Sequence, residues 1–300
     1  AKVLREEMAA INARPPLSSF GIWMLGPALL HFGTEGQKQR FLNEIARGEI
    51  RWCQGYSEPG SGSDLVSLQT FGEDKGDHWV VNGQKIWTSY ADKADWIFCL
   101  VRTDKENKYQ GITFMLFDMA SEGVSTKPIK LISGNSPFCE TFFDNVQVPK
   151  AQLVGSLNKG WEIAKYLLTH ERAMIGGFGL AGGGMKGMGQ MAAAKRGTND
   201  GRLRDTSLRA EASSFEIDEM AFGLTIERIT DETKAGQGTG ASSSILKMYG
   251  TELNKLRQEL FMAIGATDAL NFDTDSKGAL VRSWLRSKAN SIEGGTTEVQ

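Results

Sequence analysis

The chain has 300 residues, enough for about two domains or three small ones. Its 34 lysines and arginines are balanced by 36 aspartates and glutamates, which gives a formal net charge of -2. Such a chain has no overall field that would attract nucleic acid or an anionic membrane surface, so neither is expected as a partner.

Cysteine and histidine spacing argues against a disulfide framework and against a metal site. Cys53, Cys99 and Cys139 lie far apart, and no two histidines have the spacing that places two ligands on one helical face. No stretch approaches the roughly 18 apolar residues of a membrane span. We expect a reducing location without a membrane span, which is cytoplasmic or, in a eukaryote, the mitochondrial matrix.

Residues 1–50 have a helical pattern. Apolar side chains recur at helical spacing, for example from Leu25 to Phe32 and from Phe41 to Ile50. We therefore predict helices here. The chain starts without a methionine, and we expect it to be part of a longer protein.

Residues 51–150 have a strand pattern, rich in β-branched and aromatic side chains. Asn82-Gly83 stands between two alternating runs and favours the positive φ angles of a type I′ turn, so we predict a β-hairpin at 79–87. Further strands are predicted at 96–101, 112–117 and 141–148. The middle third should be a β domain.

After Pro149 the helical pattern returns. Glycines are frequent from 176 to 189, and each weakens an isolated helix by about 1 kcal/mol relative to alanine, so close approach of another helix or a flat ligand is expected there. Four long helices indicate a bundle, and they are predicted at 161–194, 208–234, 241–264 and 278–290.

Two segments of the β region suit a ligand with polar edges. Loop 55–64 contains Gly62 and several serines, so its amides and hydroxyls can surround a phosphate or a ring edge; an ordinary Gly/Ser turn is the alternative. Trp87 places a flat indole beside the hydroxyls of Thr88 and Ser89, where a ring can stack. A tryptophan packed in the core at a strand end is the alternative there.

Two segments of the helical region carry carboxylates that can act as a base. Glu171 lies between His170 and Arg172 in an apolar stretch, where loss of water makes a carboxylate more basic; an ion pair between helices is the alternative. Glu293 and Glu298 flank a double glycine. A helix end with solvated acids is the alternative for that second segment.

In this order, the segments resemble the acyl-CoA dehydrogenase family. The resemblance covers nearly the whole chain, and it rests on Tyr56-Ser57-Glu58-Pro59-Gly60-Ser61-Gly62-Ser63-Asp64, Asn82-Gly83-Gln84-Lys85-Ile86-Trp87-Thr88-Ser89, Phe142-Phe143-Asp144-Asn145-Val146, Leu153-Val154-Gly155, Glu171-Arg172 and Gly294-Gly295-Thr296-Thr297-Glu298-Val299-Gln300.

The resemblance implies an α+β multidomain fold with three parts. These are a partial N-terminal helical domain at 1–50, a central β-sandwich or barrel-like domain at 51–150, and a C-terminal four-helix bundle at 151–300. Family members usually run longer, so the first half of the N-terminal domain and the last helix are expected to be absent.

The resemblance also implies that FAD lies between the β domain and the bundle. Tyr56 and Ser57 would bond the polar edge of the flavin, and Gly62 and Ser63 would lie near the pyrophosphate or the substrate. Trp87, Thr88 and Ser89 would flank the isoalloxazine ring. Arg196 is the nearest match to an arginine that reaches the FAD of a neighbouring subunit, although the Arg-x-x-Phe-Gly pattern of the family is missing here.

The implied reaction is α,β-dehydrogenation of an acyl-CoA thioester, with electrons passed to an electron-transferring flavoprotein. Many family members place the base where this chain has Gly294, and a second branch places it before an arginine, where this chain has Glu171. Glu171 is therefore the first candidate for the base and Glu293 the second. Arg172 would position or tune Glu171 and contact the substrate region.

Three other functions remain open at this point. An acyl-CoA oxidase on the same scaffold would be reoxidised by oxygen, and a non-catalytic subunit of a hetero-oligomer would lack the base. A Gly-rich binding module would hold no flavin. By analogy with the family we expect a homodimer or homotetramer, a role in lipid degradation such as β-oxidation, and a fatty-acyl, branched-chain or sterol-derived substrate.

Overall fold

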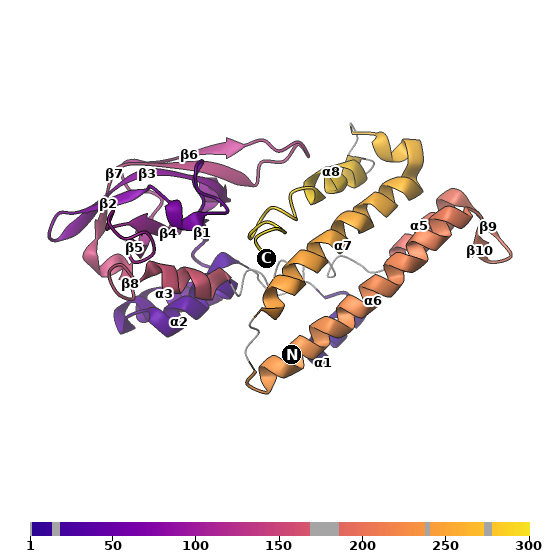
Figure 1. Cartoon of the computed structure of the whole chain (residues 1–300), viewed down its shortest axis with the longest axis horizontal. Coiled ribbons are helices and arrows are strands. Elements are labelled where there is room, and N and C mark those ends of the chain that lie inside the picture. Colours follow the sequence, from indigo (N-terminus) through magenta and orange to yellow (C-terminus); the bar gives the residue numbers. More distant parts are fainter. Residues whose placement is uncertain (1, 14–18, 169–185, 238–240, 273–277) are drawn as a thin grey trace.

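A computed structural model of the chain describes residues 2–13, 19–168, 186–237, 241–272 and 278–300. Figure 1 shows a β-sheet with the helices at 26–32 and 35–47 beside it, and a set of longer helices on the other side of the molecule, where the helix at 2–10 also lies. The expectation of an α+β multidomain fold is confirmed.

The N-terminal region contains three helices, the last of which is held in place by a capping box and a buried amide. They are α1 (Lys2–Ala10), α2 (Gly26–Phe32), which a π-helical turn precedes, and α3 (Glu35–Arg47). Thr34 and Gln37 form a capping box at the start of α3. The side-chain amide of Gln37 also donates to the carbonyls of Ala151 and Leu153, both at 2.8 Å. This ties α3 to the chain that follows the sheet.

The central region is one mixed sheet of eight strands in the order β6-β7-β3-β2-β4-β5-β8, with β1 paired in parallel to β4. The strands are β1 (Trp52–Gly55), β2 (Phe71–Asp74), β3 (His78–Ser89), β4 (Trp96–Arg102), β5 (Ile112–Asp118), β6 (Val124–Ile129), β7 (Phe138–Pro149) and β8 (Leu153–Val154).

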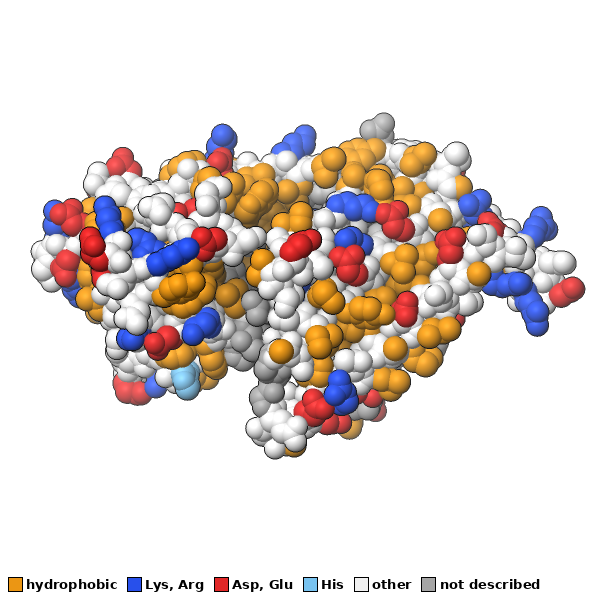
Figure 2. Space-filling model, in the orientation of Figure 1, with side chains coloured by type: hydrophobic (Ala, Val, Ile, Leu, Met, Phe, Trp, Pro, Cys, Tyr) orange, Lys and Arg blue, Asp and Glu red, His pale blue; other side chains and the backbone are white. Residues whose placement is uncertain are grey.

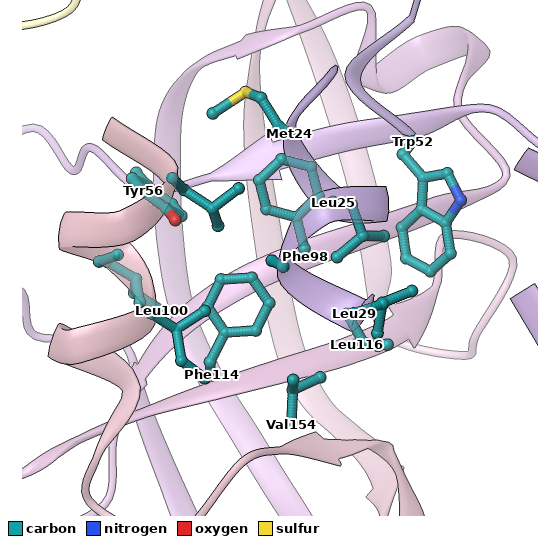
Figure 3. Packing of buried hydrophobic residues seen from close by; sticks show 14 of the residues in the cluster. Met24, Leu25, Leu29, Trp52, Tyr56, Phe98, Leu100, Phe114, Leu116 and Val154 are labelled. Atoms are coloured by element: carbon teal, nitrogen blue, oxygen red, sulfur yellow. The ribbon is translucent and has the colours of Figure 1, made fainter. Parts of the chain in front are cut away.

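Strands β4 and β5 are buried on both faces, which explains their unbroken apolar sequences. On one face, Phe98, Leu100, Phe114 and Leu116 pack against α2, α3 and the helix at 160–168 (Figure 3). On the other face, alternate residues of β4 and β5 pack against apolar residues of β3 and β7. The single sheet therefore bends into a sandwich-like arrangement, as expected for the middle of the chain.

The predicted hairpin at Asn82-Gly83 is wrong. Strand β3 continues through these residues, and its register with β7 shifts between Val81 and Gly83. The Asn82 side-chain oxygen accepts a hydrogen bond from the backbone N–H of Asn145 at 2.8 Å, so it serves the bulge and not a turn. The chain reverses earlier, between β2 and β3, where Gly76 has a φ of +94°.

The C-terminal region is helical. Its elements are α5 (Lys186–Arg196), a two-stranded hairpin of β9 (Thr198–Asn199) and β10 (Arg202–Leu203), α6 (Thr206–Lys234), α7 (Ser242–Gly265) and α8 (Gly278–Ser287). Leu208, Phe215, Phe222 and Ile229 of α6 are buried at intervals of seven residues, and so are Leu246, Leu253 and Leu260 of α7. This spacing keeps one apolar seam facing a neighbouring helix.

Not all apolar residues of the bundle are covered. Figure 2 shows hydrophobic side chains gathered on the surface over α6 and α7. On α6, Ile217, Met220 and Leu224 lie on one side at helical spacing and are each more than half exposed. Within the described ranges, no helix combines the length and the apolar character needed to cross a membrane.

Candidate functional site

Three consecutive loop residues are held against strand β3. The Lys85 ammonium donates to a carboxylate oxygen of Glu58 at 2.8 Å and to the Tyr56 carbonyl at 3.1 Å. The backbone N–H of Ile86 donates to the carbonyl of Ser57 at 2.8 Å. The predicted loop segment therefore lies beside the strand residues that come directly before Trp87.

Glu58 is buried, and both of its carboxylate oxygens accept hydrogen bonds. They accept from the backbone N–H groups of Gln69 at 2.5 Å and Thr70 at 2.9 Å, in addition to Lys85. Burial raises the pKa of Glu58, but the charge of Lys85 and these hydrogen bonds outweigh burial and hold the pKa below its ordinary value. The carboxylate is therefore the charged form at neutral pH.

The end of strand β3 carries two aromatic residues in an unusual backbone conformation. Trp87 and Tyr90 have φ angles of +61° and +53°, although bulky residues rarely adopt the left-handed region. The two residues are 52% and 53% exposed. Backbone strain of this kind costs about 1–3 kcal/mol per residue and gathers at ligand sites. Trp87 and Tyr90 thus combine a strained backbone with an exposed ring, and a flat ligand can stack on such a surface.

The bundle reaches this aromatic surface through Phe138, the first residue of β7. The rings of Trp87 and Phe138 meet edge to face with centroids 6.1 Å apart. The Arg286 guanidinium of α8 lies 5.4 Å from the centroid of the Phe138 ring and pairs with Glu293 at 2.6 Å. The candidate site therefore comprises the loop, the end of β3 and, through Phe138, the Arg286 side chain of α8.

The structure gathers some of the predicted flavin contacts and separates others. Ser57 and Ser89 are half-buried, and Gly62 and Ser63 are exposed. The Tyr56 ring is buried and meets the Phe98 ring edge to face. Thr88, which lies between Trp87 and Ser89 in the sequence, is wholly buried. Of the predicted flavin contacts on β3, that of Thr88 therefore has the least structural support.

Arg196 lies at the end of α5 next to the β9-β10 hairpin, remote from the sheet (Figure 1). Its guanidinium donates to the Ala263 carbonyl of α7 at 2.6 Å. Within one chain it is therefore separated from the Trp87 surface. Its predicted role, contact with the FAD of a neighbouring subunit, stays a prediction.

Of the two candidate bases, Glu293 is among the described residues and Glu171 is not. Glu293 is paired with Arg286 and also accepts a hydrogen bond from the side chain of Asn290. His170, Glu171 and Arg172 lie outside the described residues. The described helix at 160–168 reaches to within three residues of Glu171, and its Ile163, Ala164 and Leu167 belong to the apolar cluster that contains Tyr56.

Sequence reasoning missed Lys85, Phe138 and Arg286 as parts of this site. A lysine in an alternating strand next to apolar residues is a signal that its charge has a buried partner, and this signal could have singled out Lys85. The approach of Arg286 to Phe138 depends on how the bundle meets the sheet. Among the described residues, no group of three or more His, Cys, Asp or Glu side chains could hold a metal ion.

Comparison with known proteins identifies two regions of the chain. Residues 53–146 match the family model of the acyl-CoA dehydrogenase middle domain, and residues 158–300 match that of the acyl-CoA dehydrogenase C-terminal domain. The chain is 33% identical to the acyl-CoA dehydrogenase IpdE1 of Mycobacterium tuberculosis, over 98% of the chain and 76% of that protein. The chain belongs to the acyl-CoA dehydrogenase family.

Another relative in the family is the acyl-CoA dehydrogenase FadE34 of Mycobacterium tuberculosis, with 35% identity over 99% of the chain. The chain spans only 40% of the length of that protein. Among solved structures, the Tcur3481-Tcur3483 steroid ACAD has a TM-score of 0.83 and 30% identity, covering 93% of this chain and 73% of that one. The ChsE4-ChsE5 complex from Mycobacterium tuberculosis has a TM-score of 0.80 and 28% identity, covering 99% and 78%.

The residues present fit a flavin, the cofactor that the family implies. An isoalloxazine ring needs a flat apolar surface and polar groups at its edge, and the half-exposed Trp87 indole lies close to the Ser57 loop segment through the neighbouring Ile86. Gly60 and Gly62 have open space where a side chain would be, so a ligand can approach the loop backbone closely.

Proposed function

We propose that the protein catalyses the FAD-dependent α,β-dehydrogenation of an acyl-CoA thioester to the trans-2-enoyl-CoA. The observation that carries this proposal is the strained, half-exposed Trp87 at the end of β3, held beside the Ser57 loop and next to Phe138. Membership of the family supports the same reaction class.

In this proposal the chain holds the cofactor with its loop and with one end of a strand. Tyr56 and Ser57 would bond the polar edge of the ring, Trp87 and Ser89 would flank it, and Gly62 and Ser63 would lie towards the phosphates or the substrate. When bound, FAD accepts the hydride that leaves the β-carbon of the thioester. The apolar packing around Tyr56 keeps water away from that side of the site.

We assign the base that removes the α-proton to Glu171. The alternative, Glu293, is engaged by the side chains of Arg286 and Asn290. Arg172 is proposed to position Glu171. If neither carboxylate removes the proton, the chain is the non-catalytic subunit of a hetero-oligomer.

The acyl group is proposed to be derived from a steroid. The Tcur3481-Tcur3483 steroid ACAD supports this choice, since it shares 30% identity and the fold with this chain. We further propose lipid degradation as the role, the cytoplasm as the location, and an electron-transferring flavoprotein as the electron acceptor.

The protein is proposed to act as an oligomer. The exposed stripe of Ile217, Met220 and Leu224 on α6 supports this, because an apolar helix face of this kind is usually covered by another chain. A homodimer or homotetramer is the first expectation, and the ChsE4-ChsE5 complex supports a hetero-oligomer as the alternative.

The boundaries of the three regions, 1–50, 51–150 and 151–300, stay a prediction.

The test is the visible absorption spectrum of the purified protein under anaerobic conditions, before and after addition of straight-chain, branched and steroid-derived acyl-CoA thioesters. We expect the oxidised-flavin band, and its loss with the steroid-derived thioester. Glu171→Gln should keep the band and abolish its bleaching. A band that no thioester bleaches favours the non-catalytic subunit, and release of peroxide in air favours an oxidase.

A further inference from the structure

The ion pair between Glu58 and Lys85 is the most deeply buried one in the described part of the chain. The Lys85 side chain is 0% exposed and that of Glu58 is 6% exposed. Taking two charges out of water is costly, and a buried pair of this kind often stabilises a fold no better than two apolar side chains would. Its presence therefore calls for an explanation other than stability.

The pair is hydrogen-bonded to the backbone of the loop on both sides of Ser57 and to the segment at 69–70. Lys85 contacts both Glu58 and the carbonyl of Tyr56, on either side of Ser57. Glu58 in turn binds the backbone at Gln69 and Thr70. The loop beyond it is less enclosed, because the nearby residues Pro59, Gly60, Gly62 and Ser63 are all exposed.

Lys85 and Trp87 lie close together on the same strand, β3. Lys85 lies two residues before Trp87, and the intervening Ile86 donates its backbone N–H to the Ser57 carbonyl. The Lys85 ammonium group and this backbone hydrogen bond thus join the hydroxyl-bearing loop to the aromatic strand end at neighbouring residues. Charged hydrogen bonds hold such a separation more firmly than apolar contacts, which allow sliding.

The structure assigns Glu58 and Lys85 as a pair of positioning residues that hold Ser57 at a fixed distance from Trp87 for binding the flavin ring. The assignment rests on the proposed function. Neither side chain is exposed enough to bind the ring directly, since both are buried. Their effect reaches the ligand through Ser57 and Trp87.

The experiment compares Lys85→Met, Glu58→Gln and the double variant in the full-length protein. The matched control is Arg257→Met with Glu219→Gln, which removes another buried ion pair, one that joins α7 to α6 within the bundle. For each protein we would measure thermal unfolding, the FAD dissociation constant by flavin fluorescence, and hydrogen exchange of the Gln69, Thr70 and Ile86 amides in the flavin-free state.

We expect the double variant to melt close to the wild type but to bind FAD about tenfold to a hundredfold more weakly, because small displacements of positioned groups cost that much. The three amides should exchange faster in Glu58→Gln. The control, which also replaces both members of an ion pair, should likewise melt close to the wild type and should keep the wild-type FAD affinity. A double variant that folds and binds FAD as the wild type does would overturn the assignment.

Two further outcomes are covered. If the double variant does not fold, Lys85→Arg decides, since it keeps the buried positive charge but moves the donors; wild-type FAD affinity in that variant would contradict the assignment. A wild-type protein that binds no FAD would overturn both this assignment and the proposed function. Wild-type binding with unaffected variants would overturn the assignment alone.

Discussion

Arg286 of α8 lies over the ring of Phe138 and pairs with Glu293 at 2.6 Å, so one guanidinium joins the bundle, the sheet and the terminal segment. Asn290 donates to the other oxygen of the Glu293 carboxylate. Both oxygens of Glu293 therefore have a partner. These contacts fix the position of Glu293 relative to α8.

Glu293→Gln should leave the rate of flavin reduction by substrate unchanged, because the amide can keep one of the two contacts and the proposed base is Glu171. We expect a stability loss of about 0.5–1 kcal/mol, typical of a partly exposed ion pair. Stopped-flow reduction and urea unfolding would measure the two effects. Loss of flavin reduction in Glu293→Gln, with retention in Glu171→Gln, would reverse the assignment of the base.

The pH dependence of stability should contain a contribution from Glu58. Its pKa in the folded protein lies below the ordinary value of 4.5, so the interaction stabilises the fold above that value and is lost as the pH falls through the lower, folded-state pKa. Urea unfolding at a series of acidic pH values should show a smaller fall in stability for Glu58→Gln than for the wild type. Parallel profiles would show that Glu58 contributes nothing in this range.

The three thiols should be inert in the native protein. Cys53, Cys99 and Cys139 are free and buried, and burial raises the pKa of Cys99 to about 12. Thiolates are the reactive form, so a thiol reagent should label the native protein only at the rate of unfolding. Titration with such a reagent before and after denaturation would test this. Rapid labelling of any one cysteine in the native state would contradict it.

Gly83→Ala should be destabilising by about 1–3 kcal/mol. A Cβ atom at this position would lie 2.6 Å from the Thr70 hydroxyl oxygen and 2.7 Å from the Thr70 Cα atom, so the backbone itself would have to move. Gly223→Ala is the control, because a Cβ there meets nothing within 4 Å, and it should stabilise α6 by up to about 1 kcal/mol. Thermal unfolding of both variants measures the contrast.

Much of the bundle could be predicted from the sequence because its helices are long and periodic. The predicted helices at 208–234 and 241–264 correspond to Thr206–Lys234 and Ser242–Gly265. Strands β4 and β5 could be predicted because they are continuous apolar runs. In each case one face or both faces of the element pack against the core along its whole length, so apolar residues recur along the sequence at the spacing of the helix or strand.

The hairpin prediction failed because the local preference of Asn-Gly is compatible with two structures. A type I′ turn and a bulge both use the conformational freedom of the Asn-Gly backbone. The bulge is stabilised by Asn145, which is distant in sequence and donates a hydrogen bond to the Asn82 side chain. The same limit applies to the site. Trp87 and the Ser57 loop could be singled out from the sequence, but their contact through Ile86 and the approach of Arg286 depend on tertiary packing.

The apolar cluster around Phe98 draws residues from all three predicted regions, including Leu29 from the first and Leu167 from the third (Figure 3). Cutting the chain near residue 50 or 150 would expose this cluster and leave Gln37 without its two carbonyl acceptors. We therefore expect that the first two regions and the helix at 160–168 do not fold independently of one another. Heat should melt the sheet and its surrounding helices together, in one cooperative transition.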